Sequence, residues 1–103
     1  MRYKIEDWNN RTVFVFRESL MSFEEFSEII DRMIKPDSKS KVEITSWTES
    51  FTFIKNGIEI YFEYFYDDDS PFYSFELFPI GLKNEVSLEK LRLIMNDLNN
   101  SQI

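Results

Sequence analysis

Two alternating runs of apolar residues, 51–55 and 58–66, flank Asn56-Gly57, and no other feature of the chain constrains its fold as strongly. Asn-Gly between such runs is the strongest short signal for a β-hairpin, because both residues readily adopt the positive φ angles of a two-residue turn. The length of the turn also sets the register. The predicted cross-strand pairs are Lys55 with Ile58, Phe53 with Ile60 and Phe51 with Phe62.

The chain continues into a second predicted hairpin, whose second strand is residues 71–78. Successive side chains of a strand point to opposite faces, so neighbouring strands share one apolar face only in the matching register. A loop of four residues, 67–70, satisfies this condition. It pairs Tyr64 with Tyr73 and Phe62 with Phe75. One face then collects the predicted core of the sheet: Val42, Ile44, Phe51, Phe53, Ile58, Ile60, Phe62, Tyr64, Tyr73, Phe75 and Leu77.

Residues 22–35 carry the signals of a helix. Ser22 suits the N-cap position, and Glu25, three residues later, completes a capping box. Met21 and Phe26 occupy the positions of a hydrophobic staple, and Pro36 ends the helix. Apolar residues at helical spacing form the predicted buried stripe. They are Phe23, Phe26, Ile30 and Met33.

A second helix is predicted to start at Ser87, with Val86 and Leu91 as its staple pair. Its apolar face consists of Leu88, Leu91, Ile94, Met95 and Leu98. Beyond the helix, residues 99–103 are expected to form a frayed tail.

Three further segments are predicted to form strands. Residues 3–8 and 11–19 are joined by Asn9-Asn10 and predict an N-terminal hairpin, and residues 41–47 alternate in polarity. The expected fold class is therefore α+β with two layers. It consists of an antiparallel sheet, a four-stranded meander plus the N-terminal hairpin, with two helices packed on one face. The pattern leaves open whether the hairpin joins the main sheet.

The composition disfavours most catalytic chemistry. The chain has no His and no Cys, so it lacks the commonest general bases, nucleophiles and transition-metal ligands. Its two glycines do not make a phosphate-binding loop. Residues 67–69 are three consecutive aspartates, but they lack the alternating ligand spacing of a calcium loop. We therefore expect a protein that is not an enzyme and that uses no cofactor or metal.

The net charge of −7 over 103 residues argues against direct binding of nucleic acid, which requires a basic patch. It favours a basic partner or simply good solubility. No apolar run approaches about twenty residues, the length needed to cross a membrane. The N-terminus lacks the apolar core of a signal peptide. A single cytoplasmic domain over residues 1–103, monomeric or homodimeric and not bound to a membrane, is the expectation.

The predicted register leaves a second, outer sheet face of acidic and aromatic residues. Its members are Glu43, Thr45, Trp47, Thr52, Ile54, Glu59, Tyr61, Glu63, Phe65, Phe72, Ser74 and Glu76. Between Asn56 and Leu82 the chain has six acids and no Lys or Arg. Like charges close together on a sheet cost stability, and exposed aromatics are enriched at binding hot spots.

We therefore expect this face to bind a partner. The residues predicted to do so are Glu43, Trp47, Glu59, Tyr61, Glu63, Phe65, Asp67, Asp68, Asp69 and Glu76. A plainer interpretation has equal weight. In it, the N-terminal hairpin or a second copy of the chain covers Phe65 and Phe72, and the acids keep a strand-rich chain soluble.

In size, acidity and strand-rich α+β character, and in its lack of catalytic groups, the whole chain resembles the small acidic immunity proteins of bacterial contact-dependent inhibition systems. No specific motif carries this resemblance, so no residue roles follow from it. It implies a cognate protein toxin, often a basic nuclease, blocked by a complementary acidic surface.

Two other classes of function remain open. One is a protein that mimics nucleic acid, of the anti-restriction type. The other is a homodimeric structural or assembly module without catalysis.

Overall fold

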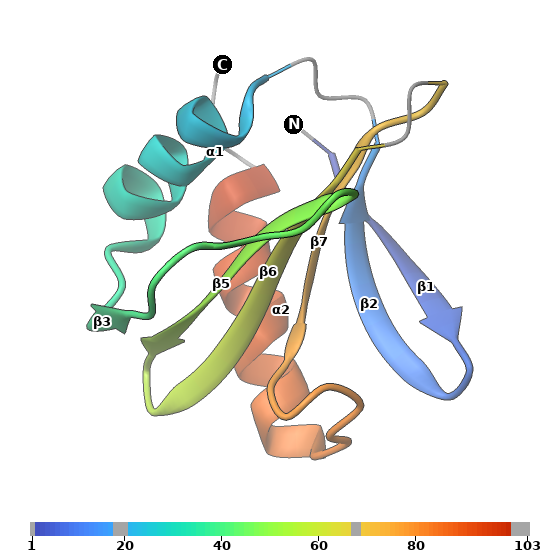
Figure 1. The fold of residues 1–103 in the computed structure, drawn as a ribbon. Helices are drawn as coiled ribbons and strands as arrows, with labels where there is room; N and C mark the ends of the chain where they lie inside the picture. The colour runs from blue at the N-terminus through green and yellow to red at the C-terminus, as the bar shows by residue number, and fades with distance from the viewer. Residues whose placement is uncertain (1, 18–20, 67–68, 100–103) are drawn as a thin grey trace.

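The computed structural model describes residues 2–17, 21–66 and 69–99. Within them, a seven-stranded antiparallel sheet carries helices on one face, so the predicted α+β class is confirmed (Figure 1). The strands are β1 (Lys4–Trp8), β2 (Arg11–Phe16), β3 (Ser38–Lys39), β4 (Glu43–Ile44), β5 (Thr48–Lys55), β6 (Ile58–Phe65) and β7 (Phe72–Leu77). The helical segments are α1 (Phe23–Ile29), η1 (Ile30–Ile34) and α2 (Glu85–Asn99).

The central hairpins have the predicted registers. Phe53 lies opposite Ile60, and Phe62 lies between Phe51 and Phe75. The turn residues Asn56 and Gly57 have φ angles of 53° and 77°, the left-handed conformation that a two-residue hairpin turn requires. Of the predicted loop 67–70, Asp67 and Asp68 lie outside the described residues.

The N-terminal hairpin joins the main sheet. β1 pairs with β2, and the turn residues Asn9 and Asn10 have φ angles of 53° and 68°. β2 then pairs with β7 over three residues, with Phe14 opposite Phe75. The strand order is β1-β2-β7-β6-β5-β3, and β4 also pairs with β5.

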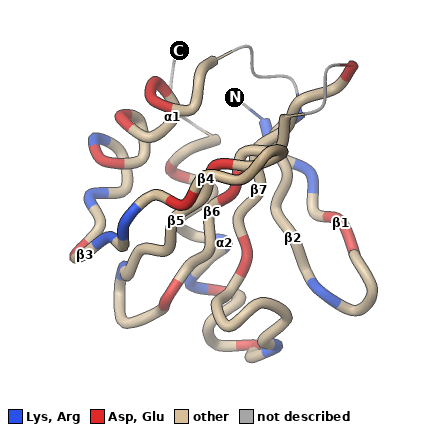
Figure 2. The backbone as a smooth tube through the Cα atoms, viewed as in Figure 1, with Lys and Arg blue, Asp and Glu red and all other residues tan. Residues whose placement is uncertain are grey.

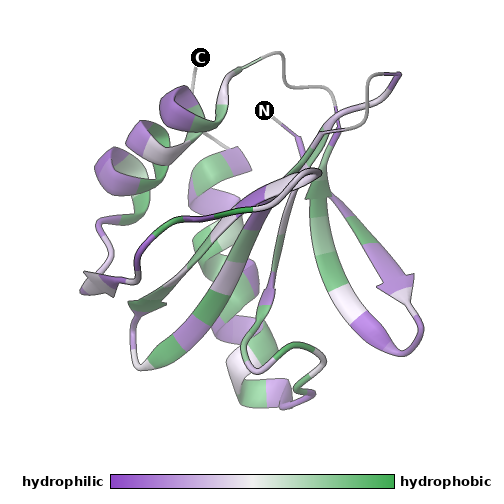
Figure 3. Ribbon diagram, viewed as in Figure 1, coloured by the Kyte–Doolittle hydropathy of each residue, from purple (hydrophilic) through white to green (hydrophobic). Residues whose placement is uncertain are grey.

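The core lies between the sheet and the helices and is mainly aromatic. Phe26 of α1 stacks on Tyr73 with ring centroids 4.1 Å apart, and it also stacks on Phe62. Phe62 and Phe75 are fully buried. Along β6 the hydrophobic and hydrophilic residues alternate, as burial of a single face requires (Figure 3). Tyr64, predicted to lie in this core, is only half-buried at its margin.

Val42 and Ile44 were predicted to lie in the core, and this prediction is wrong. Their side chains are 46% and 72% exposed. Instead of one strand over residues 41–47, two short strands pair with β5, with Lys39 opposite Phe53 and Glu43 opposite Ser50. From Lys39 to Glu43 the edge strands advance by four residues, whereas their partners on β5, Phe53 and Ser50, are three residues apart. The extra residue is a β-bulge. Beyond it, Ile44 lies opposite Glu49 and so on the same face as Phe51, as predicted, but it stands on the edge of the sheet and stays exposed.

The capping box of the first helix is present, with Ser22 and Glu25 in their predicted roles. The predicted burial of Met33 is wrong, because its side chain is 37% exposed and Ile34 is buried instead. The cause is η1, a π-helical turn in which the amide of Lys35 donates to the carbonyl of Ile30, five residues earlier. The wider turn advances the buried stripe by one residue.

The second helix begins two residues earlier than predicted, at Glu85. Its N-cap is Asn84, whose side-chain oxygen accepts hydrogen bonds from the amides of Val86 and Ser87. Val86 is 68% exposed, so it does not form the predicted staple with Leu91. The predicted apolar face is otherwise correct: Leu91, Ile94, Met95 and Leu98 are buried and Leu88 is partly buried. None of the described helices is long and apolar enough to cross a membrane.

Truncation of Phe62 to Ala tests the core. Because Phe62 is fully buried between the rings of α1 and β7, the loss of free energy of unfolding should be about 3–5 kcal/mol. Leu93→Ala is the control, since Leu93 is 58% exposed and should change stability by about 0.5 kcal/mol or less. The measurement is urea unfolding of both variants. Equal midpoints for the two would contradict the register.

Candidate functional site

The outer face of the sheet, on the side opposite the helices, carries most of the predicted binding residues. The register places Tyr61 between Thr52 and Glu76, and Glu63 between Ser50 and Ser74. Acidic residues follow β4, β5 and β6 in Figure 2, whereas basic residues gather at the η1 and β3 end. This face is not uniformly exposed, because Ser50, Ser74 and Glu76 are buried.

Glu76 is paired with an arginine from the N-terminal hairpin. The Arg11 side chain donates from Nε to Oε2 at 3.1 Å and from Nη2 to Oε1 at 2.5 Å. This bidentate ion pair raises the pKa of the Arg11 guanidinium. Glu76 is 2% exposed, so it is withdrawn from the surface that a partner can reach. Its partner precedes it by 65 positions, and no local signal in the sequence points to the pair.

Tyr61 and Glu63 form a second polar pair on this face. The Tyr61 hydroxyl donates to Oε2 of Glu63 at 2.7 Å, and both residues are half-buried. Burial is the main cause that raises the pKa of Tyr61 to about 12; the hydrogen bond to Glu63 acts in the same direction and a hydrogen bond with Ser50 opposes it. Tyr61 and Glu63, both predicted to bind a partner, are therefore hydrogen-bonded to each other within the chain.

The N-terminal hairpin packs against Phe72, which in turn stacks on Phe65. Their rings stack at a centroid distance of 5.2 Å, and the indole of Trp8 meets Phe72 edge-on at 5.7 Å. The guanidinium of Arg17 lies 4.8 Å from the Phe72 ring centroid. Glu6 accepts hydrogen bonds from both Arg17 and Trp8 and holds them in place; these two bonds lower the pKa of Glu6. The plainer interpretation is therefore correct for Phe72, and Phe65 is half-buried with its ring stacked on Phe72.

The most exposed aromatic side chain of the predicted set is Trp47, at 67%. It lies in the Trp47 turn, residues 45–48, where the amides of Trp47 and Thr48 both donate to Oγ1 of Thr45. The Thr45 amide donates to the Thr48 carbonyl, and the Tyr66 amide donates to the carbonyl of Trp47 at 2.7 Å. The turn is thus fixed to the end of β6 while its indole points to solvent.

Acidic and apolar residues surround the Trp47 turn. Ile44 is 72% exposed, and Glu43 is exposed beside it. Opposite Ile44 lies Glu49, a residue that the sequence analysis did not select. Burial, together with the nearby charge of Glu24, raises the pKa of Glu49. Neither Glu43 nor Glu49 forms an ion pair with a described residue.

The other predicted acids are dispersed. Glu59 is half-exposed on the outer face, and Asp69 is exposed beyond β6. Asp67 and Asp68 lie outside the described residues. Among the residues that are described, no three acidic side chains are grouped closely enough to hold a metal ion.

No family model matches the chain, and no curated protein or solved structure matches it either.

Replacement of Arg11 by Met tests the ion pair with Glu76. The variant keeps the apolar stem but leaves a buried carboxylate without its donors, which should cost about 1–3 kcal/mol of folding free energy. Arg32→Met is the matched control, because Arg32 is exposed and forms no ion pair with a described residue. Chemical denaturation measures the free energy of unfolding of both variants. Adding Glu76→Gln to Arg11→Met should recover part of the loss, and no recovery would contradict the pairing.

The raised pKa of Tyr61 predicts that the stability of the fold decreases at high pH. Because burial raises its pKa to about 12, the folded protein keeps the phenol proton, while the unfolded chain releases it near the ordinary tyrosine pKa of 10.0. Stability contributed by Tyr61 is therefore complete below pH 10 and falls as the pH rises towards 12. Tyrosinate absorbance of the wild type minus that of Tyr61→Phe isolates this group. A difference curve centred on pH 10 would contradict the burial.

Proposed function

We propose that the protein binds and inhibits a basic partner protein, and that the Trp47 turn and its acidic surroundings make the contact. A large aromatic side chain, 67% exposed on a turn held by several hydrogen bonds, is the observation that carries this proposal. Folding of this chain does not require an exposed indole there. Tryptophan is among the residues most enriched at binding hot spots.

The rigidity of the turn favours affinity. Ordering a side chain or loop on binding costs free energy, and a turn that is already ordered avoids much of this cost. Ile44, exposed on the adjoining edge strand, extends the apolar contact area. The aromatic anchor is therefore expected to slow dissociation of the complex.

The acids give the surface its preference for a basic partner. Glu43 and Glu49 have no ion pair among the described residues, and Glu49 also lies near the like charge of Glu24. A cationic partner would relieve this repulsion. Complementary charge mainly accelerates association and selects the partner.

The biological role that suits such a surface best is immunity against a protein toxin. The partner would then be a cognate toxin, such as a basic nuclease, whose cleft the acidic surface occupies. The overall charge of −7 favours the encounter with such a protein. The product of the neighbouring gene is the first partner to test.

Binding kinetics with that gene product test the proposal. Trp47→Ala should remove at least about 2 kcal/mol of binding free energy, mainly through faster dissociation. Reversal of Glu43 and Glu49 to Lys should slow association, and the effect should shrink at high salt because salt screens exposed charges. The matched controls on α2 are Leu93→Ala and Asp97→Lys, which should bind like the wild type.

Two results would overturn the proposal. One is a confirmed complex that Trp47→Ala leaves at wild-type affinity. The other is protection of toxin-expressing cells by the Trp47→Ala and the Glu43/Glu49 reversal variants as effective as protection by the wild type. Melting curves of all variants show that each one is folded.

A further inference from the structure

An ordered apolar loop follows β7, at the end of the sheet far from the Trp47 turn. This end loop, residues 78–82, has the sequence Phe-Pro-Ile-Gly-Leu. Phe78 is 36% exposed, and Ile80 and Leu82 are each 47% exposed. Scattered apolar residues on a surface are ordinary, but a contiguous exposed group marks a site of interaction.

Hydrogen bonds and one close contact fix the end loop. The Phe78 amide donates to the carbonyl of Glu59, and the Leu82 amide donates to the carbonyl of Pro79 at 2.9 Å. Gly81 has a φ angle of 90° and approaches Arg11 so closely that a Cβ atom there would lie 3.3 Å from the arginine Cγ. The exposed apolar side chains are therefore held in place without a cover among the described residues.

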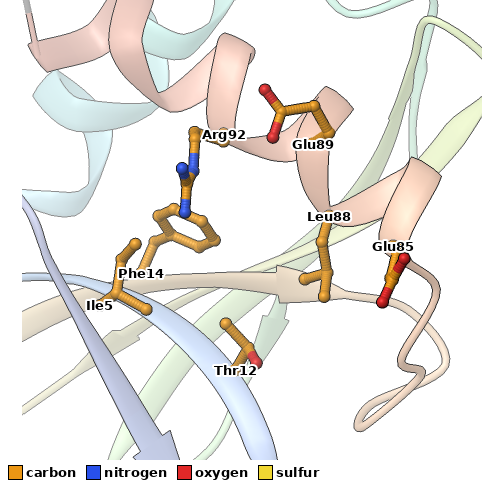
Figure 4. Close-up of a pocket in the computed structure, with 7 residues that line it drawn as sticks. All are labelled: Ile5, Thr12, Phe14, Glu85, Leu88, Glu89 and Arg92. Carbon is orange, nitrogen blue, oxygen red and sulfur yellow. The ribbon is translucent and has the colours of Figure 1, made fainter.

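A hollow lies beside the end loop, between the N-terminal hairpin and α2 (Figure 4). Its volume is about 190 Å³, and its lining residues are Ile5, Thr12, Phe14, Glu85, Leu88, Glu89 and Arg92. It exists because β2 pairs with β7 only from Phe14 to Phe16, so the turn end of the hairpin separates from the sheet. Arg92 points over Phe14, and Glu85 and Glu89 are arranged along the helix (Figure 4).

The end loop and the hollow form one continuous end surface. Gly81 contacts Arg11, and the next residue of that strand, Thr12, lines the hollow. Glu85 begins α2 directly after the loop and also lines the hollow. A surface that carries both a projection and an adjacent recess can complement itself across a two-fold axis.

We propose that two copies of the chain associate through this end surface, with the end loop of each copy packed against the hollow of the other. The hollow is smaller than the roughly 300–1,000 Å³ of ordinary small-molecule sites, and it suits one or two aliphatic side chains. Ile80 and Leu82 are such side chains. Lys83, next along the chain, brings a cation towards a rim with two acids, Glu85 and Glu89, and one base, Arg92.

The contact is a weak one. Apolar patches of this kind cover a few hundred Å², whereas a stable interface buries about 800 Å² on each partner. The pair therefore exchanges with monomers and has a dissociation constant in the micromolar range. Because the end loop and the Trp47 turn lie beyond opposite ends of β6, the inference does not depend on the proposed function.

Sedimentation of the purified chain between about 1 μM and 1 mM, a range that spans micromolar dissociation constants, tests the inference. The wild type should shift from monomer to dimer with concentration. Ile80→Asp should raise the dissociation constant at least tenfold, whereas Leu93→Asp, an equal change at an exposed residue of α2, should leave it unaltered. Circular dichroism checks that both variants are folded.

Charge reversal identifies the contact itself. Lys83→Glu and Glu89→Lys should each weaken self-association, because each places like charges across both symmetric contacts. An equal mixture of the two variants should restore dimers, since every contact then joins opposite charges. A chain that stays monomeric up to about 1 mM, a dimer unchanged by Ile80→Asp, or a mixture without restored dimers would each overturn the inference.

Discussion

The pairing of β2 with β7 over only three residues decides most of what is distinctive in this protein. It attaches the N-terminal hairpin to the sheet and buries Phe14 and Phe16 against the aromatic core. It also brings Arg11 to Glu76 and Trp8 to Phe72 on the outer face. Because the pairing stops at Phe14, the turn end of the hairpin separates from β7 and leaves the hollow beside α2. One short ladder thus supports a core, a polar network and a recess.

The structure divides the acids into two groups with different consequences. Glu76, Glu63 and Glu6 have hydrogen-bonding partners on the outer face. Glu76 joins β7 to β2 through Arg11, and Glu6 joins the two arms of the hairpin through Arg17, whereas Glu63 bonds Tyr61 within β6. Glu43 and Glu49 have no such ion pairs with described residues and lie beside an exposed tryptophan. A carboxylate with its partner in place has little to gain from a second protein. The candidate binding site therefore moves from the centre of the sheet to its β4–β5 edge.

The two exposed apolar regions are suited to different kinds of contact. The Trp47 turn combines one large aromatic side chain with a single sign of charge, which favours a partner of opposite charge. The end surface combines aliphatic side chains with both signs of charge, which permits self-complementarity. Since they lie at opposite ends of the sheet, a pair of chains joined at the end surfaces would still present both Trp47 turns.

The sequence by itself determined the features that depend on neighbours along the chain. The Asn56-Gly57 turn, the Ser22 capping box and the alternation of β5 and β6 predicted the hairpin registers and the apolar faces correctly. Only the tertiary structure decided which faces are covered. A π-helical turn leaves Met33 exposed, and an edge position leaves Ile44 exposed, although both lie in apolar patterns. The arginine that pairs with Glu76 comes from a strand 65 positions earlier in the sequence. Alternation shows which residues share a face, but long-range packing decides whether that face meets protein or water.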